Sequence, residues 1–136
     1  EKGQGAFLNN RRLRVSGRKN LEEALFATGI PFAGRDGHAR YLEQLKSVMA
    51  KTSGIRRFGS AALDLAYVAA GRYEGFWETG LHPWDIAAGI VLVREAGGFV
   101  TDMDGKDGMM NSGDIIAAND LLHGTLSKIL AKTASK

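Results

Sequence analysis

The sequence contains no cysteine, which excludes disulfide bonds and thiolate metal sites and favours a reducing, cytoplasmic environment. Long hydrophobic runs are also missing, because no stretch reaches the ~18 apolar residues of a membrane-spanning helix. The opening stretch EKGQGAFLNN (1–10) lacks the apolar core of a secretory signal peptide. These absences point away from secreted, disulfide-stabilised and membrane-embedded proteins.

The 136 residues are 44% hydrophobic and 24% charged, which is typical of one globular domain. The net charge of +3 suits an anionic small substrate such as a phosphate ester. Basic residues crowd into RRLRVSGRK (11–19), which predicts either a nucleic-acid patch or the charged edge of a β-hairpin. We favour the hairpin edge because no aromatic stacking residues are interleaved there. The residues concerned are Arg11, Arg12, Arg14, Arg18 and Lys19.

Strand and helix patterns alternate along most of the chain. GAFLNNRRLRVS (5–16) predicts a hairpin with an Asn-Asn turn. Further strands are expected at 24–32, 53–59, 73–79, 98–103 and 114–119. Helical patterns cover 38–51, 60–71, 83–96 and 120–132. Such alternation predicts a layered α/β sandwich.

The predicted helices carry informative ends and faces. Ser60 is expected as an N-cap, Gly71 as a terminating glycine and Pro83 as a first helical residue. Residues 86–93 are apolar all round, so we expect helix 83–96 to be buried on every side. Inward faces of the other two helices are expected to consist of Tyr41, Leu42, Leu45, Val48 and Met49, and of Leu122, Leu126, Ile129 and Leu130.

Three places meet the general description of a ligand site, because ligands of α/β sheets collect at strand carboxyl ends and helix amino ends. Gly59, Ser60 and Ala61 form a strand-to-helix junction, Glu78 ends a strand, and Asp85 lies in the first turn of the next helix. We therefore expect these side chains and backbone groups to gather at one edge of the sheet.

Asp85 has a structural and a chemical explanation. Its carboxylate either complements the helix dipole, worth ~0.3–1 kcal/mol, or binds a divalent cation that offsets the cost of burial beside Trp84 and an apolar run. The sequence alone favours neither of these two explanations over the other. A glycosidase-like pair of Glu78 and Asp85 is weakly indicated, since a solvated strand-end glutamate is commoner. His82 is interpreted as a structural residue of the helix start.

Other motifs carry no functional signal. DMDGKDG (102–108) lacks the glutamate that ends a calcium-binding loop, where Gly113 stands instead, so it is interpreted as a turn. Ser60 lacks a nucleophile elbow, so capping is its expected role. His38 and His123 are expected in polar surroundings.

WDIAAGIVLVREAGG (84–98) resembles the carboxyl-terminal signature of the inositol monophosphatase family, with its Trp-Asp pair, Ala/Gly cluster and Gly-Gly end. The hairpin at 1–16 resembles the mid-chain hairpin of that family, IRRFGSAALDLAYVAAGRYEGFWE (55–78) its substrate-side segment, and DIIAAN (114–119) its closing strand. ATGIPF (27–32) is similar to the bacterial branch. The resemblance covers essentially the whole chain.

The resemblance implies a Mg²⁺-dependent phosphate monoesterase that acts on myo-inositol monophosphate by direct in-line hydrolysis, as a homodimer with an α/β/α sandwich and a mixed sheet. Asp85 is implied as a catalytic metal ligand that also contacts substrate, and Glu78 as the acid that binds a sugar hydroxyl. Gly59, Ser60 and Ala61 are implied to line the inositol.

The family's Asp-Pro-Ile/Leu-Asp-Gly-Ser/Thr signature, which supplies most metal ligands, is absent here. The resemblance therefore implies a carboxyl-terminal half, inactive alone, with residues 1–18 joining the sheet of the amino-terminal domain and residues 19–136 forming the carboxyl-terminal domain. The lack of an initiator methionine fits this expectation of a longer protein. Alternatives are a nucleotide 3′-phosphatase or fructose-bisphosphatase relative, or a module that binds a second copy or RNA machinery.

Overall fold

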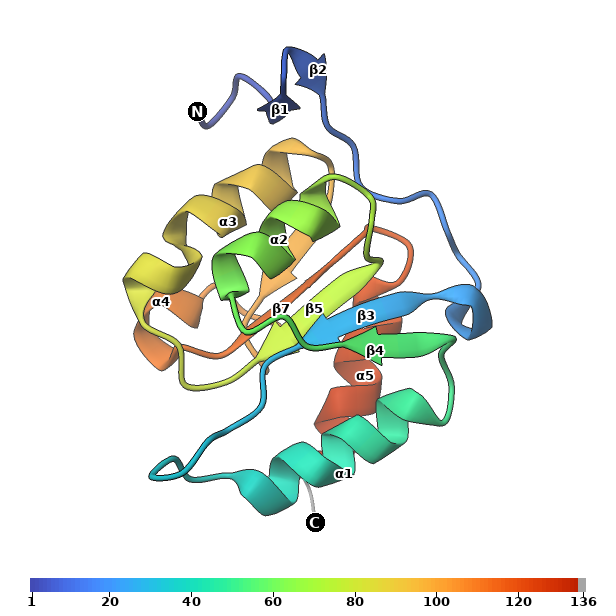
Figure 1. Cartoon of the computed structure of the whole chain (residues 1–136), viewed down its shortest axis with the longest axis vertical. Coiled ribbons are helices and arrows are strands. Elements are labelled where there is room, and N and C mark those ends of the chain that lie inside the picture. Colours follow the sequence, from blue (N-terminus) through green and yellow to red (C-terminus); the bar gives the residue numbers. More distant parts are fainter. Residues whose placement is uncertain (135–136) are drawn as a thin grey trace.

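Five strands form one mixed sheet in the computed structural model, which describes residues 1–134, with the strand order β4-β3-β5-β7-β6 (Figure 1). They are β3 (Leu25–Thr28), β4 (Gly54–Arg56), β5 (Gly75–Glu78), β6 (Phe99–Thr101) and β7 (Ile115–Ala118). β3 runs parallel to β4 and β5, whereas β7 is antiparallel to β5 and β6. The carboxyl ends of β3, β4 and β5 therefore meet at one edge.

Helices cover both faces of this sheet (Figure 1). α2 (Ala61–Ala69) and α3 (Pro83–Glu95) pack on one face, and α1 (His38–Met49) and α5 (His123–Ala134) pack on the other. Because side chains alternate along a strand, Phe76 of β5 enters the core under α2 and α3, while Trp77 enters the core under α1 and α5. The predicted α/β/α sandwich with a mixed sheet is confirmed.

The amino-terminal hairpin forms a separate two-stranded sheet beyond α3, from β1 (Phe7–Leu8) and β2 (Arg11–Arg12) (Figure 1). Asn9 and Asn10 have φ values of 50° and 64°, as the tight turn of a hairpin requires and asparagine tolerates. The predicted Asn-Asn turn is confirmed. The chain then continues through η1 (Leu21–Glu23) into β3.

The ends of α2 and α3 follow the sequence signals. Ser60 Oγ accepts the backbone N–H of Leu63 at 3.3 Å, Pro83 is the first residue of α3, and Gly71 follows α2 with a φ of 75°. Among the described residues, no helix has the length and apolar character that crossing a membrane requires.

Two expected helix faces are wrong. α3 buries only the side that faces the sheet and α2, through Ile86, Gly89, Ile90 and Val93, whereas Trp84 is 76% exposed. In α1, Tyr41 and Val48 are buried, but Leu42 and Met49 are exposed. These two residues lie seven positions apart on one flank of the helix, which neither the sheet nor α5 covers.

The segment after β6 contains the predicted turn and, in addition, a short helix. Residues 102–108 form the expected turn, in which the Asp102 carboxylate accepts the N–H groups of residues 104, 106 and 108. A short helix, α4 (Met109–Ser112), follows it and was not predicted. His123 is buried, but its Nε2 atom has a polar neighbour, Thr101 Oγ1 at 3.1 Å, and burial lowers its pKa.

Candidate functional site

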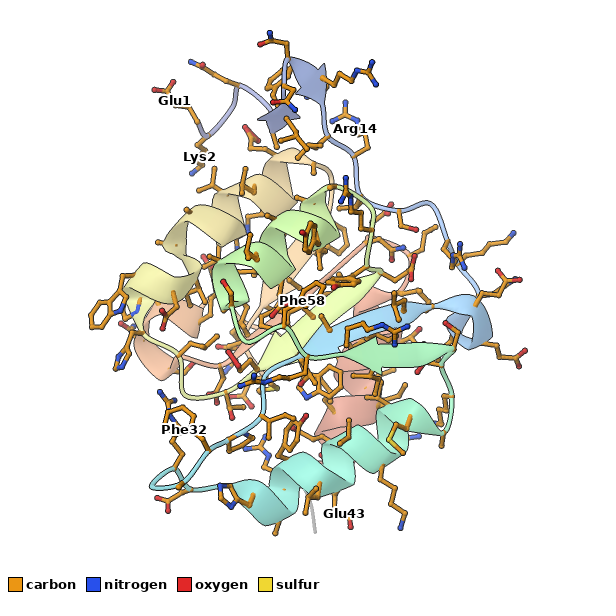
Figure 2. All side chains as sticks on the ribbon, in the orientation of Figure 1. Glu1, Lys2, Arg14, Phe32, Glu43 and Phe58 are labelled. Carbon is orange, nitrogen blue, oxygen red and sulfur yellow. The ribbon has the colours of Figure 1, made fainter. Side chains whose placement is uncertain are left out.

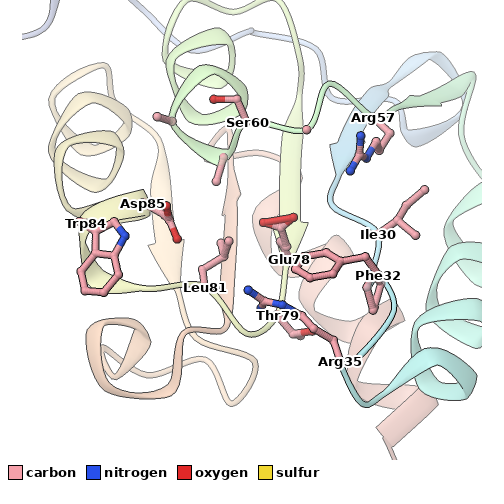
Figure 3. A pocket seen from close by; sticks show the side chains of 14 residues that line it. Ile30, Phe32, Arg35, Arg57, Ser60, Glu78, Thr79, Leu81, Trp84 and Asp85 are labelled. Atoms are coloured by element: carbon pink, nitrogen blue, oxygen red, sulfur yellow. The ribbon is translucent and has the colours of Figure 1, made fainter.

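A cavity of about 340 Å³ opens where β3, β4 and β5 end and where α2 and α3 begin (Figure 3). The five residues expected to form a site all line it: Gly59, Ser60, Ala61, Glu78 and Asp85. They come from three separate segments of the chain, which only the sheet topology brings together. The structure thus gathers the predicted residues, while the role of each in binding stays a prediction.

The β4–α2 junction offers backbone groups to this cavity. Gly59 has a φ of 84°, and a Cβ added there would lie 2.9 Å from Arg57 Nη1, so both conformation and space favour glycine. The Ser60 hydroxyl caps the helix, which confirms the capping interpretation. Because the first N–H groups of a helix lack intrahelical partners, those of Ala61 and Ala62 are available to a ligand at the cavity wall.

Glu78 lies in the centre of the cavity in Figure 3, at the end of β5. Burial and, to a smaller extent, the Asp64 carboxyl together raise the pKa of its carboxyl to about 7, against the opposing effect of Arg35. Its position depends on Gly29, since a Cβ there would lie 1.1 Å from Glu78 Oε1. The charge of the Glu78 carboxyl therefore changes near neutral pH. The carboxyl occupies space that is open only because residue 29 is a glycine.

Asp85 caps α3 as well as lining the cavity. Its Oδ2 accepts the backbone N–H of His82 at 2.9 Å, which orients the carboxylate and leaves its other oxygen for a ligand. The His82 ring stacks on Trp84 with centroids 4.5 Å apart. Because Trp84 is exposed and Asp85 only partly buried, the expected apolar burial of this carboxylate is wrong. Asp85 does lie in the first turn of α3, where the helix-dipole explanation places it, and cation binding stays a prediction.

Two arginines line the cavity and were missed as site residues. Arg35 donates to the Gly80 carbonyl and lies over the Phe32 ring, 4.8 Å from its centroid. Arg57 follows the end of β4, so the strand-end rule that selected Glu78 also applied to it. Arg35 lies in the polar loop before α1, and only the fold brings it to the cavity. In Figure 3, Arg57 lies across Glu78 from Asp85, and the guanidinium group of Arg35 lies below Glu78.

The residues present fit a metal site only in part. Within residues 1–134, no three His, Cys, Asp or Glu side chains gather in a way that could hold a metal ion. Since Mg²⁺ prefers several oxygen ligands, Asp85 could supply one of them but not the set. The arrangement of this chain is that of a partial site: one oriented carboxylate, one carboxyl that titrates near neutrality, free helix N–H groups and two guanidinium groups.

Comparison with known proteins matches the whole chain, residues 1–136, to the model of the inositol monophosphatase family. An inositol-1-monophosphatase of Mesorhizobium japonicum is 56% identical over 135 residues, which are 99% of this chain and 51% of that protein. A Pseudomonas aeruginosa protein named Nus factor SuhB is 56% identical over 120 residues, covering 87% of this chain and 44% of its own length.

Solved structures agree with these matches. The crystal structure of the extragenic suppressor protein suhB from Bartonella henselae superposes with a TM-score of 0.94 at 56% identity, covering 97% of this chain and 50% of that one. An inositol monophosphatase from Anabaena superposes with a TM-score of 0.89 at 41% identity, covering 96% and 53%. The chain thus spans about half the length of the relatives that it matches.

Proposed function

Because this chain belongs to the inositol monophosphatase family, we propose that it is the carboxyl-terminal half of a Mg²⁺-dependent phosphatase that hydrolyses myo-inositol monophosphate. The observation that carries this proposal is the gathering of Gly59, Ser60, Ala61, Glu78 and Asp85 around one cavity. In this proposal the remaining metal ligands come from the other half of the protein, and the isolated chain is inactive.

Each residue of the cavity has a role in the proposed reaction. Asp85 contributes one oxygen to Mg²⁺, because the His82 N–H holds its carboxylate in place. When bound, Mg²⁺ supplies activation of water and neutralisation of the phosphate charge. Glu78 binds a hydroxyl of the polyol, and the N–H groups at the start of α2 bind another polar group of the substrate. Arg35 and Arg57 attract the anionic ester.

Uncovered apolar helix faces support a second half that packs against this one. The sides of α2 and α3 that face away from the sheet carry Ala62, Leu63, Trp84, Ala87 and Ala88, all of them exposed. A helix face in contact with water is normally polar. We propose that the other half covers this surface, that its sheet takes up the hairpin in residues 1–18, and that residues 19–136 form the carboxyl-terminal domain.

The test of this proposal is reconstitution. The chain is joined to the part of the Mesorhizobium japonicum protein that lies outside the matched region, and phosphate release is measured with and without Mg²⁺. We expect turnover of inositol 1-phosphate that exceeds turnover of fructose 1,6-bisphosphate and adenosine 3′,5′-bisphosphate. Preference for the adenosine compound would replace the polyol by a nucleotide as the substrate.

Substitutions in the reconstituted protein test the individual roles. Asp85→Asn should abolish Mg²⁺-dependent turnover while the far-UV circular dichroism spectrum is unchanged, and Asp36→Asn, an exposed carboxylate, serves as the control. Glu78→Gln should raise KM about tenfold, the value of one hydrogen bond to a charged group. Full activity of Asp85→Asn at saturating Mg²⁺ would remove Asp85 from the metal site.

A second candidate function is contact with RNA machinery. Relatives from Pseudomonas aeruginosa and other bacteria are named Nus factor SuhB. Arg11, Arg12 and Arg14 are exposed, and Figure 2 shows Arg14 just after β2. Arg18 is less available, because it is paired with Glu74 at 3.5 Å. Salt-dependent RNA retention that disappears when the three exposed arginines become alanine would support this function, and retention that persists would remove the hairpin from it.

A further inference from the structure

The loop of residues 79–82 joins the two acids of the candidate site, since Glu78 ends β5 and Asp85 lies in the first turn of α3. Leu81 lines the cavity and lies between these two acids in Figure 3. The loop also supplies the His82 N–H that orients the Asp85 carboxylate, at 2.9 Å from Oδ2. A shift of this loop therefore moves the group that holds the carboxylate in place.

The segment between α4 and β7 runs beside this loop. β5 and β7 are antiparallel up to the pair of Glu78 and Ile115, so the residues beyond this pair continue side by side. The Leu81 N–H donates to the Gly113 carbonyl at 2.9 Å. Gly113 has a φ of 76°, and a Cβ added to it would lie 2.3 Å from the Leu81 carbonyl oxygen. The two backbones are therefore so close that only glycine fits between them.

The Asp114 side chain makes a second contact with the loop. Its Oδ1 atom accepts the Gly80 N–H at 3.2 Å, and its own backbone N–H donates to Ser112 Oγ at 3.1 Å. A hydrogen bond to a carboxylate is stronger than one between neutral groups. The Gly80 carbonyl accepts a hydrogen bond from Arg35. Gly80 is thus held at both of its polar groups, although the residue is exposed.

α4 anchors this segment to the core of the protein. Met109 of α4 is 2% exposed and belongs to the same hydrophobic core as Ile86 and Val93 of α3. α4 packs against α3 and lies beside its start (Figure 1). The turn that leads into α4 is itself fixed, because the Asp102 carboxylate accepts three of its N–H groups. The segment that touches the loop is therefore a firm support.

We propose that Asp114 is a positioning residue, which holds the loop through Gly80 and thereby keeps the His82 N–H and the Asp85 carboxylate in place for Mg²⁺. Asp114 acts through the loop, because its carboxylate bonds to Gly80 and is not part of the cavity wall. A ligand oxygen held in its bound position binds a metal more tightly than one that must first be ordered. The role toward Mg²⁺ rests on the proposed function, whereas the support of the loop does not.

Amide hydrogen exchange, measured by NMR on the 136-residue chain without divalent cations, tests the support of the loop. In Asp114→Ala, we expect the Gly80 N–H to exchange about tenfold faster than in wild type, because a hydrogen bond to a charged group is lost. Asp114→Asn removes the charge but keeps an acceptor oxygen, so the increase should stay below about threefold. Asp120→Ala is the matched control, since it removes an exposed carboxylate beyond the other end of β7, and it should leave this exchange unchanged.

Metal dependence in the reconstituted protein tests the positioning of Asp85. Asp114→Ala should raise the Mg²⁺ concentration that gives half-maximal turnover by about tenfold. Asp114→Asn should restore this concentration to within about threefold of wild type. A residue that served only the stability of the fold would lower the melting temperature and leave the Mg²⁺ dependence of the folded protein unchanged.

Equal exchange of the Gly80 N–H in Asp114→Ala and wild type would overturn the proposal, and so would an unchanged Mg²⁺ dependence of an active Asp114→Ala protein. If Asp114→Ala does not fold, a Gly80 N–H that exchanges in wild type as fast as in an unstructured peptide overturns it equally. Faster exchange in Asp114→Ala, combined with no Mg²⁺-dependent hydrolysis by the reconstituted wild type, would uphold the support of the loop and reject the proposed function. The two failures are thus distinguishable.

Discussion

Gly89→Ala should weaken the contact between α2 and α3. A Cβ at position 89 would lie 2.4 Å from Leu65 Cδ1 and 2.6 Å from Leu65 Cβ, whereas 3.4–4 Å is ordinary van der Waals contact. The Leu65 side chain can turn its Cδ1 atom away, but its Cβ is fixed to the backbone of α2. The two helices would therefore have to separate by nearly an ångström, roughly the 0.8 Å by which the Cβ distance falls short.

The expected magnitude follows from two opposing effects. Overpacking a dense core costs about 1–3 kcal/mol, while replacing a helical glycine by alanine contributes up to about 1 kcal/mol. The free energy of unfolding should therefore fall by about 1–2 kcal/mol. Urea denaturation of the chain, followed by far-UV circular dichroism, measures this difference.

Gly124→Ala is the matched control. Gly124 also lies in a helix, α5, but a Cβ there would meet no atom within 4 Å, so this substitution should be neutral or stabilising by up to about 1 kcal/mol. If Gly89→Ala stabilised the chain as Gly124→Ala does, the close approach of α2 and α3 at Leu65 would be refuted. Since α3 also carries Asp85 at its start, the separation should lower turnover in the reconstituted protein as well.

Three further predictions concern Glu78, Asp102 and Gly29. Because folding raises the Glu78 pKa to about 7 from 4.5, the folded chain holds a proton that the unfolded chain releases, so the free energy of unfolding should fall as pH rises from about 4.5 to 7. Glu78→Gln should reduce this fall by about 1–2 kcal/mol, allowing for partial solvent screening, and equal pH profiles in urea denaturation would contradict it. Asp102→Ala removes three hydrogen bonds to backbone N–H groups and should lower the free energy of unfolding by about 2–4 kcal/mol; a change in thermal unfolding below about 0.5 kcal/mol would show that the turn does not need them. Gly29→Ala should displace the Glu78 carboxyl by about 2 Å, since the new Cβ would lie 1.1 Å from Glu78 Oε1. This displacement should raise KM for inositol 1-phosphate with little change in Mg²⁺ dependence. An unchanged KM would show that Glu78 does not bind the substrate.

Local signals were reliable where a few neighbouring residues decide the conformation. Asn9 and Asn10 take the positive φ of a tight turn, and Ser60 caps α2. These features depend on backbone conformation and on hydrogen bonds over three or four positions, so the residues themselves determine them.

Predictions of burial were less reliable because they depend on what packs against an element. Leu42 and Met49 fit the helical pattern of α1, yet both are exposed, and α3 buries one side although both sides are apolar. His123 was expected in polar surroundings, and it does contact Thr101 Oγ1, but it is buried and packs edge-on near Phe99. The pattern of apolar residues along a helix does not predict how many of its faces are covered by neighbouring helices or strands.

The sequence by itself determined the order of the strands and of the longer helices, the serine cap and the terminating glycine of α2, the proline that starts α3, and the residue types at the strand ends. Only the tertiary structure decided that Glu78, Asp85 and the α2 start share one cavity, that Arg35 reaches it, and that Asp64 is buried. The physical reason is distance along the chain. Hydrogen bonds and periodicity act over a few residues, whereas the meeting of parallel strand ends and the desolvation of a carboxyl depend on segments that lie far apart in sequence.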